Sequence, residues 1–108
     1  MTKVYCIILA SKDGELPLVS KMCIGDTDAF SFAQSQAIEH VKHVFQGEID
    51  QEEQIERIQN CKDLERCGIL DDLALLSIAF SNAMREANKR NLENYFSCEL
   101  TIKYAEVH

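Results

Sequence analysis

Two histidines, His40 and His43, come closer to a metal site than any other residues in the chain. On a helix, residues three or four apart are neighbours, so Glu39 can also reach His43. Imidazole and carboxylate ligands together suit zinc or iron. The spacing differs from that of His-Glu-x-x-His, however, and a third ligand would have to come from elsewhere. We therefore predict a helix flank on which both histidines face water, with no metal and no cofactor; a metal enzyme stays the alternative.

Five cysteines offer a second kind of chemistry. Lys62 and Arg66 lie beside Cys61 and Cys67, where positive charge could lower a thiol pKa or favour a redox disulfide. The cysteine count is odd, and no pair has Cys-x-x-Cys spacing. We therefore expect reduced thiols in a cytoplasmic protein, with thiol enzymology as an alternative. The five are Cys6, Cys23, Cys61, Cys67 and Cys98.

An acidic run is the strongest candidate for a working surface. The chain has 18 acidic and 11 basic residues, which gives a formal net charge of −7. Such charge repels nucleic acid and anionic membranes and speeds association with basic proteins. The run lacks the spacing of an EF-hand calcium loop. We predict that it binds a basic protein partner through Glu48, Asp50, Glu52, Glu53 and Glu56; the alternative is a solvated helix face with no partner.

Several catalytic and binding motifs are absent from the sequence. It has no Gly-x-Ser-x-Gly nucleophile turn and no glycine-rich phosphate loop. The one basic cluster, Arg85, Lys89 and Arg90, is small and lies among acidic residues, which argues against nucleic-acid binding. No apolar run approaches the roughly 20 residues that span a bilayer. We therefore expect neither an enzyme nor a membrane protein.

The elements that position these residues follow from periodicity. The 108 residues predict a single domain, 1–108. Val4–Ala10 is continuously apolar, which is typical of a central strand buried on both faces or nearly so. Asp13-Gly14 predicts a hairpin turn, and Leu16–Ile24 the return strand. Pro17 cannot donate to a sheet ladder, so that strand belongs at an edge.

Three helices and a last strand are predicted next. The first has N-cap candidates at Asp26, Thr27 and Asp28, and Gly47 can end it. A weaker helix has capping-box spacing at Asp50 and Glu53. The third has an apolar first half, 73–80, that we expect to be buried. In the last strand an apolar face alternates with a wet face, which is formed by Ser97, Glu99, Thr101 and Lys103.

The order ββαααβ predicts an α+β domain in two layers. Its three-stranded, mainly antiparallel sheet has the first strand in the centre and helices over one face. Our leading hypothesis is a small, acidic, non-catalytic binding protein, most concretely an inhibitor or immunity-type protein that neutralises a basic toxin or nuclease. One alternative is an adaptor or homo-oligomer subunit that uses a sheet edge or the wet face around Glu99, Thr101 and Lys103.

Overall fold

A computed structural model describes residues 2–11, 17–61, 69–92 and 98–107 of the chain. Three strands form one antiparallel sheet in the order β2-β1-β3, and the predicted α+β fold with a central first strand is confirmed. The strands are β1 (Thr2–Ser11), β2 (Pro17–Ile24) and β3 (Cys98–Val107). The helices are α1 (Asp26–Val44), α2 (Gln51–Gln59) and α3 (Ile69–Lys89).

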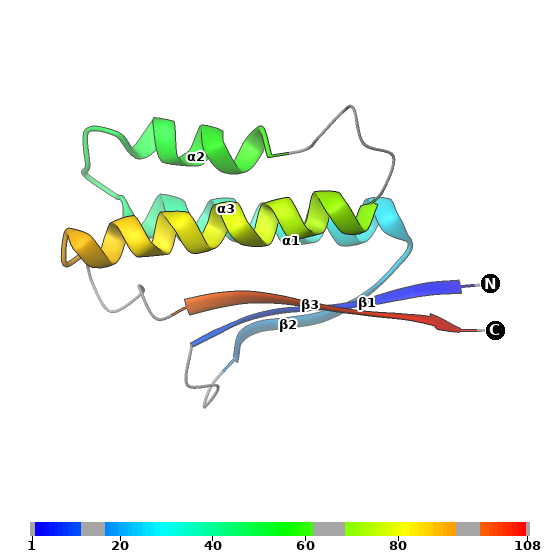
Figure 1. Cartoon of the computed structure of the whole chain (residues 1–108). Helices are drawn as coiled ribbons and strands as arrows, with labels where there is room; N and C mark the ends of the chain where they lie inside the picture. Colours follow the sequence, from blue (N-terminus) through cyan, green and yellow to red (C-terminus); the bar gives the residue numbers. More distant parts are fainter. Residues whose placement is uncertain (1, 12–16, 62–68, 93–97, 108) are drawn as a thin grey trace.

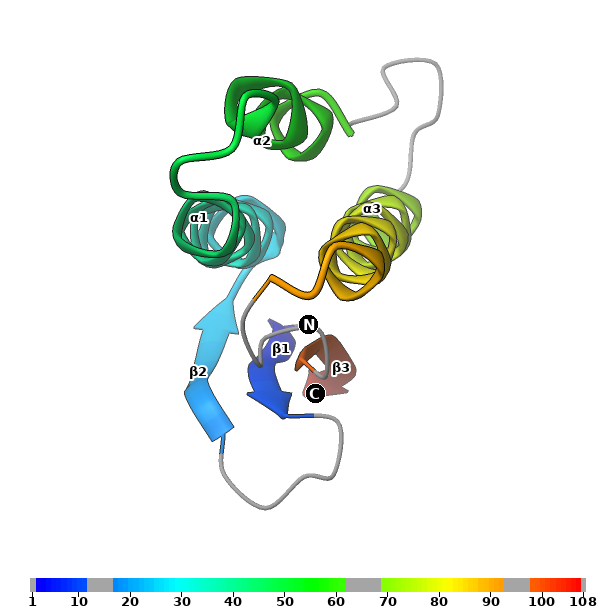
Figure 2. The same ribbon diagram turned by 90° about the vertical axis from the view of Figure 1, so that its left-hand side faces the viewer.

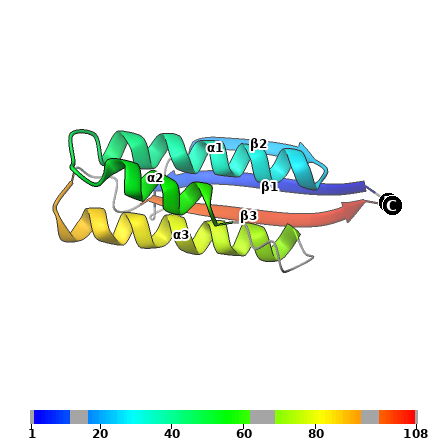
Figure 3. The same cartoon turned by 90° about the horizontal axis from the view of Figure 1, so that it is seen from above.

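All three helices lie on the same side of the sheet (Figure 1). The end view in Figure 2 shows α1 above β2 and α3 above β3, with α2 resting on both helices at the side away from the sheet. Seen from above, α1 and α3 run side by side along the strands (Figure 3). The acidic helix α2 is therefore held by other helices and is separated from the sheet by their layer.

Strand β1 is covered on one face only. Tyr5, Ile7 and Leu9 point towards the helices and are buried, whereas Val4, Cys6 and Ile8 alternate with them and are only partly buried. Successive side chains of a strand point to opposite faces, so the second set lies on the outer face of the sheet. The prediction that this strand is buried on both faces is wrong for the outer face, because the helices pack on the inner one.

The turn into α1 depends on backbone conformation. The N-cap is Gly25, at φ 91° and ψ 155°, and the predicted capping by the acidic residues that follow is wrong. Glycine has no Cβ, so it adopts this positive φ at little cost. The Gly25 amide donates to the carbonyl of Lys3 at 3.0 Å. Asp26 is instead the first helical residue, and its Oδ1 accepts a hydrogen bond from Tyr5 Oη at 2.5 Å.

A narrow stripe of small residues seats α1 on the core. Ala29, Ala33 and Ala37 recur every four residues and are fully buried, and Val41 and Val44 continue the stripe. Small side chains allow the helix to approach its neighbours closely. The helix ends at Val44, earlier than the predicted end at the glycine three residues later.

Helix α3 is amphipathic over residues 72–89, where its side chains are described. Leu73, Leu76 and Phe80 are buried, but the side chain of Ile78 is 58% exposed, so the predicted burial of this half on nearly every side is wrong. Ser77 Oγ donates to the carbonyl of Leu100 at 2.7 Å and ties the helix to β3.

The two edge strands agree with prediction where they are described. Strand β2 begins at Pro17 and lies at the edge of the sheet. In β3, Cys98 and Leu100 are buried, while Thr101 and Lys103 on the other face are exposed. The predicted Asp13-Gly14 turn, and Ser97 on the wet face, lie outside the described residues.

Candidate functional site

Helix α2 packs against the rest of the protein through a narrow row of buried residues. Its buried residues are Gln54, Ile55 and Ile58. At its start, Gln51 Nε2 donates to the carbonyl of Lys42 at 2.8 Å. At its end, Gln34 Nε2 donates to the carbonyl of Ile58 at 3.2 Å and to that of the next residue at 3.1 Å. These contacts with α1 fix the rotation of α2, so that its acidic side faces away from the protein.

Arg90, just after α3, binds the residues that precede α2. Its Nη1 and Nη2 donate to the two carboxylate oxygens of Asp50, each at 2.7 Å. Its Nε donates to Glu86 at 3.1 Å, and Nη1 lies 3.6 Å from Glu48 Oε1. This bidentate geometry holds the pKa of Asp50 well below its usual range and raises that of Arg90.

The capping box predicted for α2 is wrong. Asp50 is the N-cap residue, but its side chain makes no capping hydrogen bond to the helix backbone. It accepts hydrogen bonds from Arg90 and from Gln54 Nε2 instead. Glu53 pairs with Arg57 one turn later, at 2.9 Å. An arginine provides two aligned donors to a carboxylate, which makes it a stronger partner than backbone amides at an exposed helix end.

The five acidic residues of the predicted surface therefore divide into two groups. Glu48 and Asp50 pair with Arg90 of the same chain, and their side chains are 34% and 23% exposed. The other three, Glu52, Glu53 and Glu56, are exposed on α2. Among the described residues Glu52 and Glu56 form no ion pair. We call Glu52, Glu53 and Glu56 the acidic face of α2.

The two histidines do not share one environment. His40 is buried, with 9% of its surface exposed, and its ring centroid lies 5.8 Å from that of Phe80 on α3. Burial lowers its pKa to about 4, and the charge of His43 adds to this effect. His43 itself is exposed, so the prediction that both face water is wrong for His40. No three or more His, Cys, Asp or Glu side chains within the described ranges are placed to hold a metal ion.

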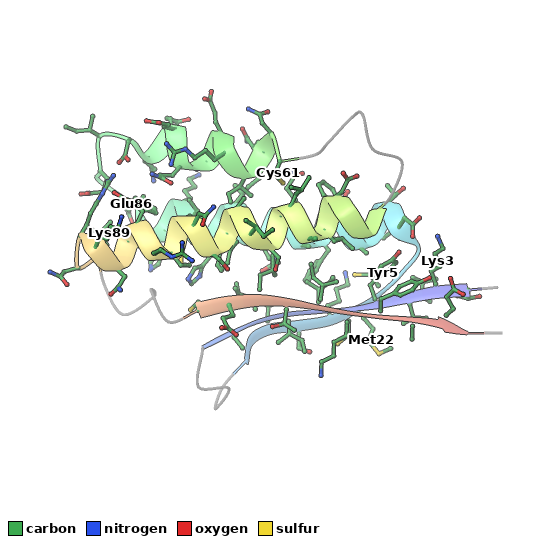
Figure 4. The ribbon with its side chains drawn as sticks, viewed as in Figure 1. Lys3, Tyr5, Met22, Cys61, Glu86 and Lys89 are labelled. Atoms are coloured by element: carbon green, nitrogen blue, oxygen red, sulfur yellow. The ribbon has the colours of Figure 1, made fainter. Side chains whose placement is uncertain are left out.

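The described cysteines are free thiols. Cys61 lies at the end of α2 and is partly buried (Figure 4). Burial raises its pKa, and the charge of Asp72 adds to the effect. This is the reverse of the shift that a reactive thiol needs. The predicted partners Lys62, Arg66 and Cys67 lie outside the described residues.

The outer face of the sheet carries an apolar patch that was not predicted from the sequence. Met22 and Ile24 are 68% and 67% exposed there, and Figure 4 shows Met22 pointing away from the helices. Each pairs across the strands with an apolar residue of β1, Met22 with Cys6 and Ile24 with Val4. The sequence signal was the run of apolar residues in β1, which supplies both faces. We call this set the outer patch: Val4, Cys6, Ile8, Met22, Ile24 and Ala105.

Comparisons with models of protein families, with curated proteins and with solved structures found no match. Within the part of the chain that the structure describes, none of the helices combines the length and the apolar character needed to cross a bilayer. The function is therefore argued from the surfaces alone.

Proposed function

We propose that the protein is a small, acidic, non-catalytic binding protein that recognises a basic surface of another protein through the acidic face of α2. The observation that carries the proposal is the exposure of Glu52 and Glu56 on a helix that is held at both ends. Both are exposed, neither is neutralised by a described residue, and the helix beneath them is fixed by hydrogen bonds at each end. Preformed charge of this kind raises association rates with oppositely charged partners.

The roles of the five predicted residues differ in this proposal. Glu52, Glu53 and Glu56 contact the partner, and Arg57 limits the contribution of Glu53 because it pairs with it. Glu48 and Asp50 act indirectly, because their interactions with Arg90 hold the start of α2 against α3. They belong to the support of the surface and not to the surface itself.

The most concrete form of the proposal is an inhibitor or immunity-type protein in the cytoplasm. Enzymes that cut nucleic acid bind phosphates with lysine and arginine side chains, and a rigid acidic helix is complementary to such a cleft. Covering the cleft blocks the substrate without any chemistry by the inhibitor. This form fits the small size and the absence of catalytic motifs in the sequence.

Charge reversal on α2 tests the proposal. The protein is immobilised and proteins retained from native extract are identified by mass spectrometry at low and at about 0.5 M salt, where screening shortens the range of charge interactions to below about 5 Å. A basic protein should be retained at low salt, and the double variant Glu52→Lys and Glu56→Lys should lose it. The retained protein is then purified, and its affinity and nuclease activity are measured with each variant.

A matched control reverses two exposed acids away from α2. The double variant Asp28→Lys and Glu106→Lys, at the start of α1 and the end of β3, changes the net charge by the same amount but leaves the acidic face intact. It should keep most of the affinity. If both double variants weaken binding equally, net charge and not α2 sets the affinity, and the proposed site is wrong.

A further inference from the structure

The outer patch is unusual for a sheet that faces water. Antiparallel sheets with one solvated face alternate apolar and polar residues, so that the exposed positions are polar. In β3 the outer positions follow this rule with Glu99, Thr101 and Lys103. In β1 and the end of β2 they do not, because Val4, Cys6 and Ile8 face outward beside Met22 and Ile24. Strand β1 has the apolar pattern of a strand that is buried on both faces, but the helices cover only one of its faces.

We propose that two copies of this chain associate by packing the outer faces of their sheets against each other. The proposal is independent of the binding function assigned to α2, which lies on the opposite side of the molecule (Figures 1 and 2). Face-to-face packing of sheets about 10 Å apart is a common way to bury apolar faces. It leaves both copies of α2 accessible.

The charges of this face favour a second copy over a charged partner. Two copies of a chain with net charge −7 repel one another unless the surfaces that meet are close to neutral. Among the described residues, the outer positions of the sheet carry one acid, Glu99, and one base, Lys103, which balance. They lie four residues apart on β3, so a twofold arrangement can place each opposite the other charge of the second copy. The exposed acids of α2 lie on the far side.

The size of the face is sufficient for a weak, specific dimer. The three strands have 10, 8 and 10 residues, and at about 3.3 Å per residue and about 4.8 Å per strand they give a flat area of about 450 Å² per copy. Two copies would bury about 900 Å² of flat area, and the uneven surface of the side chains adds to this value. The flat area alone is near the lower limit of about 1,000 Å² for specific interfaces. We therefore expect a weak dimer.

Sedimentation velocity over about 1 to 200 µM protein tests the proposal, because a dimer with a dissociation constant in this range passes from mostly monomer to mostly dimer across it. The wild-type protein should pass from monomer to dimer. Met22→Glu should raise the dissociation constant by about tenfold or more, since it buries an unpaired charge. Ile78→Glu places the same charge at an exposed apolar residue of α3 and should leave the dimer unchanged. A wild-type monomer throughout, or a dimer that tolerates Met22→Glu, would overturn the proposal.

Alkylation of Cys6 by iodoacetamide tests the same face without any substitution. Cys6 lies in the outer patch on the central strand, and partly buried Cys61 at the end of α2 is the internal reference. Alkylation of Cys6, relative to Cys61, should slow severalfold at concentrations where dimer forms. If dimer forms but the alkylation rate of Cys6 relative to Cys61 stays the same, the copies associate through a strand edge or through the helices. That result would also refute the proposal.

Discussion

Replacement of His40 should change how the stability of this protein depends on pH. The imidazole is buried between α1 and α3 beside Phe80, and its pKa is about 4 instead of the ordinary 6.5. Burial opposes the charged form, and the nearby His43 opposes it further. The unfolded chain therefore holds a proton on this side chain more tightly than the folded protein. Stability should fall as the pH drops from about 7 towards 4.

The magnitude follows from the two pKa values. A difference of this size corresponds to about 3 kcal/mol when the side chain is protonated in both states, because one pKa unit equals 1.36 kcal/mol. At pH 7 the unfolded side chain is mostly neutral, and the loss is a few tenths of a kcal/mol. At pH 5 it is about 2 kcal/mol. His40 alone should therefore cost the protein about 2 kcal/mol between these two pH values.

Urea denaturation at pH 7 and pH 5 measures this loss, with wild type and His40→Gln compared at equal ionic strength. The variant should lose about 2 kcal/mol less than wild type over the interval, whatever its stability at pH 7. His43→Gln, at the exposed neighbour, should keep most of the wild-type loss. His40→Leu provides a second test if the glutamine variant does not fold. Equal losses in wild type and the His40 variants would refute the assignment of the pH dependence to this buried imidazole.

Three further changes test the packing around the sheet and α2. Asp50→Asn should destabilise the protein at pH 7 but reduce its loss of stability below pH 4. The ion pair with Arg90 lowers the pKa of Asp50, so its contribution to stability is present above the ordinary pKa of an aspartate and is lost in acid. Urea titrations at pH 7 and pH 3 measure both effects. Tyr5→Phe should cost about 1–2 kcal/mol by removing the hydrogen bond to Asp26, and an unchanged melting temperature would contradict this role. Gly25→Ala should cost about 1–3 kcal/mol from the backbone conformation alone, because φ 91° with ψ 155° is almost restricted to glycine and no atom lies within 4 Å of the added Cβ; chemical denaturation measures it.

Local patterns were enough to predict the sheet order and the three helices. The apolar run of β1 indicated a central strand, and Pro17 placed the returning strand at an edge. The helical spacing of apolar residues in α1 also indicates that His40 is buried. It lies seven residues after Ala33 and three after Ala37, on the side of α1 that carries the buried stripe. The polarity of histidine predicts a water-facing side chain, but the position of His40 on the buried side of α1 decides its environment.

The contacts of the acidic run at residues 48–56 were harder to predict from the sequence. Asp50 and Arg90 are 40 residues apart, and no periodicity connects them. Only the packing of α2 on α3 shows that two of the five predicted acids, Glu48 and Asp50, bind an arginine of the same chain. The outer patch was missed for a related reason. The apolar run indicated two buried faces, but the sequence did not show on which side the helices would pack.

The position of Arg90 has a consequence for local opening of the structure. Helix α2 contributes few apolar side chains to the core, so alone it would open at low free energy. The guanidinium group, however, connects the residues before α2 to the last turn of α3, where Glu86 also binds it. Opening α2 therefore also removes partners from the end of α3. We therefore expect the two segments to open as one cooperative unit, with amide hydrogens that exchange together and ahead of those in β1.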